Sequence, residues 1–197
     1  DPLREGFLHF EESVRAMQAG QASHHYTMAV PRDFFAAWLG ERLASFRTDN
    51  PDVQFALVDG ESSDFTEANL DLAVRWSEGP GELEGIMLGH AEMVRICAAG
   101  QAGGGDEPLV FWQGQADLAA DDAVLTVPDA GQALAAAAAG LGVAEVPSLL
   151  AEKWIADGRV VQVGEPLPSS RAYWLVAPVP QWRQKKVRAL VEHLGTD

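Results

Sequence analysis

Apolar segments of two kinds alternate along most of this chain, and this alternation constrains the fold more than any other feature. Short, almost uniformly apolar runs at Tyr26–Val30, Val53–Val58 and Leu70–Arg75 predict buried β-strands. Between them, Phe34–Phe46 carries apolar residues at helical spacing, and Phe65–Asn69 predicts a short helix. Strands that alternate with helices form parallel sheets with helical crossovers, so the sequence predicts an α/β protein.

The same alternation starts again after a glycine-rich stretch, Gly100–Pro108. Further strands are expected at Ile86–Leu88, Met93–Ala98, Leu109–Trp112, Ala123–Val127, Gly142–Val146, Val160–Val163 and Tyr173–Ala177. Helices are expected at Pro128–Ala139, Pro147–Ala156 and Gln181–Leu194. The repetition predicts two similar α/β lobes.

Charge excludes several classes of partner. The 197 residues include 29 Asp and Glu against 14 Lys and Arg, which gives a formal net charge of −15. Such a field repels phosphate backbones and anionic lipid, so we expect this chain itself to bind neither nucleic acid nor a membrane surface. No apolar run is long enough to span a bilayer, and no signal-peptide pattern opens the chain.

The residue inventory argues against metal or catalytic chemistry. The single cysteine, Cys97, excludes an intrachain disulfide, fits a reducing compartment, and is expected to be buried. The five histidines lack metal-ligand spacing. Gly60–Asp64 begins like a nucleophile elbow but has Asp where the final Gly is required. We therefore expect no metal, no cofactor and no enzymatic activity.

The first segment has a heptad pattern, with Leu3, Phe7, Phe10, Val14 and Met17 at alternating steps of four and three. This pattern suits a seam with a partner helix. A helix that packs on its own domain would show the same spacing over so short a stretch.

Several short motifs follow one another in a characteristic order along the chain. The motifs are Phe34-Phe35-Ala36-Ala37-Trp38-Leu39, Asn50-Pro51-Asp52-Val53, Leu70-Asp71-Leu72-Ala73-Val74-Arg75, Gly140-Leu141-Gly142-Val143-Ala144, and Tyr173-Trp174-Leu175-Val176-Ala177-Pro178. None is diagnostic alone, but together they resemble the effector-binding domain of LysR-type transcriptional regulators, especially the branch of the glycine-cleavage and β-lactamase regulators. The resemblance covers Tyr26 to Leu194.

The resemblance implies two Rossmann-like lobes joined by two crossover strands, as in type 2 periplasmic binding proteins. Residues 1–24 would end a linker and dimerisation helix, residues 25–93 with 175–197 would form lobe one, and residues 94–174 lobe two. The crossings would be Val94–Ala99 and Arg171–Val176. The implied function is effector sensing and self-association as a dimer or tetramer in the cytoplasm. DNA would be bound only through an N-terminal winged helix-turn-helix that this sequence lacks.

The candidate site lies where strands end, because ligands of open α/β sheets bind at the carboxyl ends of the strands. The turns Pro31–Asp33 and Thr126–Asp129 should face each other and offer free backbone N–H groups to a small anion such as a carboxylate. The candidate ligand-binding residues are Pro31, Arg32, Asp33, Gly60, Arg75, Trp76, Thr126, Val127, Pro128, Asp129 and Trp174.

Several candidates also have structural interpretations. Asp33 and Asp129 are well placed to cap helices, Arg75 could pair with an acid, and Trp174 could belong to the core. LysR-type relatives usually carry an effector-binding Ser or Thr at the first turn, where this chain has Pro31–Asp33, which puts that hydroxyl contact in doubt.

Two other functional classes share this architecture. One is the solute-binding protein of a transporter, which a signal peptide upstream would favour and a helix-turn-helix upstream would exclude. The other is an enzyme on the same two lobes, against which the missing catalytic residues argue.

Overall fold

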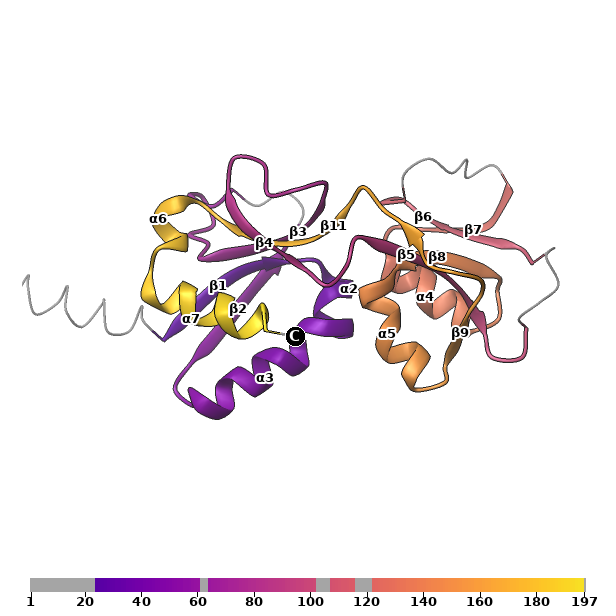
Figure 1. Cartoon of the computed structure of the whole chain (residues 1–197), viewed down its shortest axis with the longest axis horizontal. Coiled ribbons are helices and arrows are strands. Elements are labelled where there is room, and N and C mark those ends of the chain that lie inside the picture. The colour runs from indigo at the N-terminus through magenta and orange to yellow at the C-terminus, as the bar shows by residue number, and fades with distance from the viewer. Residues whose placement is uncertain (1–23, 61–63, 102–106, 116–121, 197) are drawn as a thin grey trace, which may run out of the picture.

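A computed structural model describes residues 24–60, 64–101, 107–115 and 122–196. Residues 1–23, which hold the expected heptad helix, and most of the glycine-rich stretch lie outside these residues. The described chain forms two α/β lobes that lie side by side, each built on one sheet (Figure 1). The predicted fold class, two α/β lobes of the periplasmic-binding-protein type, is confirmed.

The first lobe contains a five-stranded sheet in the order β2-β1-β3-β11-β4. Its strands are β1 (His25–Val30), β2 (Gln54–Asp59), β3 (Leu72–Ser77), β4 (Glu84–Leu88) and β11 (Ala172–Ala177). Strand β1 runs parallel to β2 and β3, whereas β11 is antiparallel to β3 and β4. The helical segments are α2 (Arg32–Phe34), the π-helical η1 (Phe35–Leu39), α3 (Gly40–Asp49), α6 (Val179–Trp182) and α7 (Lys185–Leu194).

The second lobe contains a six-stranded sheet in the order β10-β5-β8-β6-β7, with β9 paired to β5. Its strands are β5 (Glu92–Ala98), β6 (Leu109–Trp112), β7 (Ala123–Val127), β8 (Val143–Pro147), β9 (Val160–Gln162) and β10 (Leu167–Pro168). Its helices are α4 (Ala130–Ala138) and α5 (Ser148–Ala156). The alanines of α4 that face the sheet are buried, which lets this helix lie close to its neighbours.

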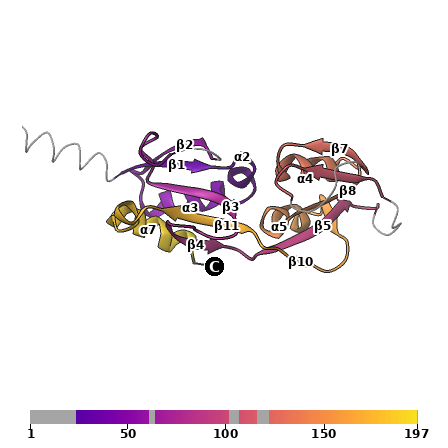
Figure 2. The same cartoon turned by 90° about the horizontal axis from the view of Figure 1, so that it is seen from above.

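Two connections join the lobes. The chain leaves the first sheet after Leu88 and enters the second at Glu92, and it returns between Pro168 and Ala172 (Figures 1 and 2). Strand β5 belongs wholly to the second sheet and β11 wholly to the first. We therefore propose lobe boundaries at these two connections. The crossings expected at Val94–Ala99 and Arg171–Val176 were wrong, because these segments lie almost wholly within β5 and β11.

Two helix predictions were wrong. Phe65–Asn69 is a turn, in which the Asp64 carboxylate accepts the N–H groups of Thr66 and Glu67, and Asn69, with φ 49°, ends it in the left-handed region. The single helix expected over Gln181–Leu194 is two helices, because Gln184, with ψ 138°, breaks the helical path before α7.

Candidate functional site

Helices from the two lobes meet directly after two strand ends. Strand β1 ends at Val30 and leads into α2, and β7 ends at Val127 and leads into α4. Helix α2 contacts α4, and a Cβ atom built on Gly131 of α4 would lie only 2.7 Å from the Cβ of Asp33. The turns Pro31–Asp33 and Thr126–Asp129 thus come together across the interlobe cleft.

Asp33 does not cap its helix as expected. Pro31 is the N-cap, so Asp33 lies in the first turn, and its carboxylate accepts the N–H of Phe34 at 2.8 Å. The backbone N–H of Gly131 in the other lobe lies close enough to lower the pKa of the Asp33 carboxyl. Burial is the main cause that raises the pKa of the Asp33 carboxyl, and the nearby charge of Asp129 is the second. Backbone hydrogen bonds act in the opposite direction but do not cancel these two effects.

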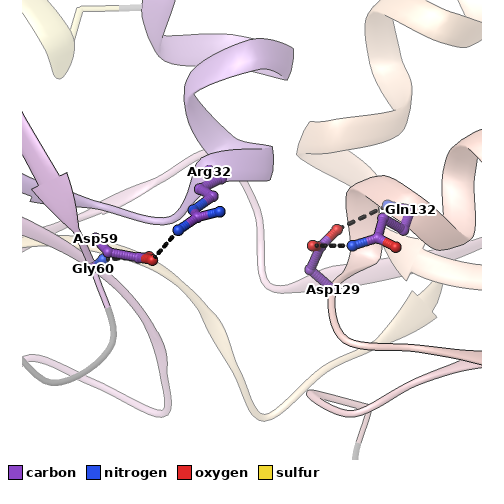
Figure 3. Close-up of polar contacts among 5 residues, drawn as sticks. All are labelled: Arg32, Asp59, Gly60, Asp129 and Gln132. Atoms are coloured by element: carbon purple, nitrogen blue, oxygen red, sulfur yellow. Dashed lines mark hydrogen bonds and ion pairs between the residues drawn. The ribbon is translucent and has the colours of Figure 1, made fainter.

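Asp129 does cap its helix, as predicted. Its carboxylate accepts the backbone N–H of Gln132 at 2.8 Å and the side-chain amide of the same residue at 3.0 Å (Figure 3). The N–H groups of Phe34 and Gln132 are therefore already bonded to carboxylates of the chain. The sequence expectation of free N–H groups at both turns therefore does not hold for Phe34 and Gln132, which the two aspartates occupy.

Arg32 and Gly60 lie together on the first-lobe side of the cleft, where both contact Asp59. The Arg32 guanidinium donates to Asp59 at 2.7 Å, and both side chains are exposed (Figure 3). Gly60 donates its N–H to the Asp59 carboxylate, and a Cβ atom there would lie 2.7 Å from the backbone of Val30 and Pro31. Glycine is thus needed for the close approach of this loop to the end of β1.

A pocket of about 480 Å³ opens between the helices of the two lobes. Its apolar walls are Ala36 and Ala37 of η1, Leu134 and Ala135 of α4, and Leu150 and Trp154 of α5. Its charged lining includes Arg32, Asp33, Asp129, Lys153, Asp157 and Arg159. Of the residues predicted from the sequence, Arg32, Asp33 and Asp129 line this pocket.

Helix α5 was missed as a source of site residues. Lys153 donates to Glu41 of the first lobe at 2.5 Å, and the Arg159 guanidinium lies 3.5 Å from the centre of the Trp154 ring. The helix itself was expected, but its spacing of apolar residues says nothing about which lobe its outer face meets. A tryptophan and a lysine together on a short helix were the available signal.

An aromatic contact also bridges the lobes near the ends of strands β3 and β6. The Trp76 ring lies 6.3 Å from that of Trp112 in the second lobe and 4.9 Å from that of Tyr173. Trp112 is held by its indole N–H, which donates to the Glu145 carbonyl at 2.8 Å. A second, open depression of about 600 Å³ lies beside Trp76 and Arg171.

Two buried polar groups near these strand ends lack hydrogen-bond partners in the described part of the chain. They are the indole N–H of Trp76 and the side-chain amide of Gln115, which follows Trp112 and is 8% exposed. Buried polar groups are nearly always hydrogen-bonded, so these two are exceptions among the described residues.

The remaining candidates lie outside both pockets. Arg75 is exposed and lies 5.7 Å from the Phe65 ring, and Trp174 is partly buried against the core. Thr126, Val127 and Pro128 position the start of α4 without lining either pocket.

Residues 19–197 match the family described as the LysR substrate binding domain. The chain belongs to this family. It is 26% identical over 199 residues to HvrB, the AhcY transcriptional activator of Rhodobacter capsulatus, across 89% of this chain and 68% of that protein. This LysR domain is the effector-sensing part of a transcriptional regulator, and the comparisons give no support to the transporter alternative.

Solved effector domains have the same fold. The effector domain of AmpR from Pseudomonas aeruginosa matches with a TM-score of 0.70 at 21% identity, over 87% of this chain and 96% of that one. The AmpR effector-binding domain from Citrobacter freundii matches with a TM-score of 0.71 at 19% identity, over 87% and 98%. These neighbours fit the branch predicted from the sequence.

Within the described ranges, no group of three or more His, Cys, Asp or Glu side chains could hold a metal ion. Among the same residues, no helix has the length and apolar character needed to cross a membrane. Cys97 is buried, and burial raises the pKa of its thiol.

Proposed function

We propose that this LysR domain binds a small-molecule effector in the 480 Å³ pocket between η1, α4 and α5. The observation that carries the proposal is that both lobes line this pocket, so a ligand there would bind differently to open and closed arrangements. Differential affinity for two arrangements is what lets a ligand control a conformational change. We further propose that the effector is bound without being converted, since the relatives are transcriptional regulators.

The pocket chemistry suits an effector with an apolar body and a carboxylate. Alanine, leucine and tryptophan side chains would cover the body. The carboxylate would bind Arg159, which has no carboxylate partner among the described residues and is held by its stacking on Trp154. A guanidinium forms paired hydrogen bonds with a carboxylate, so it can replace the N–H groups that Asp33 and Asp129 occupy.

A thermal-shift screen with small carboxylic acids, matched amides and amines tests this proposal. We expect a carboxylic acid to raise the Tm, with a stabilisation of about 2.7 kcal/mol at a hundred times its Kd. Arg159→Gln should abolish the shift, whereas Arg188→Gln, at an exposed position on α7, should leave it unchanged. A shift that survives Arg159→Gln would place the effector elsewhere.

We also propose that the domain acts in the cytoplasm and self-associates as a dimer or tetramer. A sensor that reports to a DNA-binding protein has to work in the compartment that holds the DNA. The heptad pattern in residues 1–24 supports a seam between copies of the chain. That segment lies outside the described residues. DNA would be bound through another part of the regulator.

A further inference from the structure

Gly131 lies where the two lobes approach each other closely. A Cβ atom at this position would lie 2.7 Å from the Cβ and 3.4 Å from the Cα of Asp33. The shorter distance is well inside van der Waals contact, so any larger residue would force the helices apart. Glycine at this position therefore allows the two lobes to come into contact.

The contact is also polar. The N–H of Gly131 belongs to the first turn of α4, where backbone N–H groups have no partner within the helix. The Asp33 carboxyl of the other lobe lies beside this N–H group, which favours its ionised form. A carboxylate near a helix N-terminus also interacts favourably with the helix dipole. The first lobe thus places a carboxylate at the N-terminus of helix α4 in the second lobe.

Opposing forces keep this contact weak enough to open. Burial of the Asp33 carboxyl disfavours its ionised form, and so does the charge of Asp129 at the same helix end. The other charged groups that line the pocket beside Asp33 are Arg32, which pairs with Asp59, and Lys153, which pairs with Glu41, together with Asp157 and Arg159. An exposed pair such as Glu41–Lys153 contributes little to closure.

The connections between the lobes are suited to a rotation. Each spans only a few residues, and Gly89 in one of them has φ +66°, a conformation that other residues rarely adopt. Hinge motions between domains are usually absorbed by a few such positions.

We propose that Asp33 and Gly131 form a latch that holds the two lobes together across the cleft. The carboxylate of the first lobe holds the start of α4, and loss of this contact lets the lobes separate. The latch does not depend on the chemistry of the effector or on the role of Arg159.

Pulsed dipolar spectroscopy of the 197-residue chain without effector tests the latch. Cysteines for spin labels would replace Ser45 of α3 and Ala156 of α5, both exposed, and Cys97 is buried. The labelled protein should give a single distance population. Gly131→Ala and Asp33→Ala should each add a population at longer distance. Asp33→Asn should stay closed, because it keeps an oxygen acceptor and removes the repulsion with Asp129.

Two controls separate the latch from general effects. Gly79→Ala places a methyl group where nothing lies within 4 Å, and Glu41→Gln removes only the exposed ion pair with Lys153. Both should give the parent distance, and thermal unfolding should show that every variant is folded. The latch is overturned if Gly131→Ala and Asp33→Ala keep the parent distance, if Glu41→Gln opens the cleft as far as Asp33→Ala, or if the parent is already open.

Discussion

At the residue scale, one buried ion pair ties the C-terminal helix to the first sheet. Lys186 of α7 lies 2.8 Å from Asp71, and the two side chains are 15% and 14% exposed. Lys186 also donates to the carbonyl of His25, and Asp71 accepts the N–H of Thr27. Each charge is thus almost fully bonded within the protein, and removal of one partner would leave the other buried without compensation.

Lys186→Met should therefore lower the free energy of unfolding by about 3 kcal/mol, as measured by urea denaturation. Lys185→Met, at the exposed neighbouring position, should change it by less than about 0.5 kcal/mol. The double variant Lys186→Met with Asp71→Asn should recover part of the loss, because no uncompensated charge remains. Equal stability of Lys186→Met and Lys185→Met would contradict a structural role for the ion pair.

At the element scale, apolar periodicity predicted most strands and helices because burial on one sheet face or one helix face has a fixed period. Strand β1 and helices α4 and α5 lie almost where the sequence placed them. Local hydrogen bonding and local helix geometry could not be predicted from this apolar pattern. The Asp64 carboxylate replaced a helix by a turn, and η1 interrupts the helix predicted over Phe34–Phe46 without any proline or glycine within its five residues.

Helix α4 gives an element-scale prediction. Ala137 is fully buried in the helix that packs on β6 and β8, so a larger side chain has no space there. Ala137→Leu should lower the free energy of unfolding by about 1–3 kcal/mol. Ala139→Leu, on the exposed side of the same alanine run, should stay within about 0.5 kcal/mol. Similar chemical denaturation midpoints for both variants would mean that the helix does not lie so close to the sheet.

At the scale of the whole molecule, the sequence predicted two lobes and a cleft but not how the lobes close. Patterning specifies which face of a helix is buried within its own lobe, and it carries no information on contacts between lobes. The pairing of Glu41 with Lys153 and the approach of Asp33 to Gly131 join residues far apart in the chain. The turns were predicted correctly as neighbours, whereas their hydrogen-bond partners required coordinates.

Net charge gives the prediction that belongs to the molecule as a whole. Binding to duplex DNA depends on cations that replace the counterions of the phosphates, and this chain carries a formal charge of −15. Several of its cations already have acidic partners, among them Arg32, Arg95, Lys153 and Lys186. The isolated chain should therefore not shift the electrophoretic mobility of duplex DNA, even at low salt, where such binding is strongest. Binding that weakens steeply as salt is added would reveal a cationic surface and contradict the assignment of DNA contact to another part of the regulator.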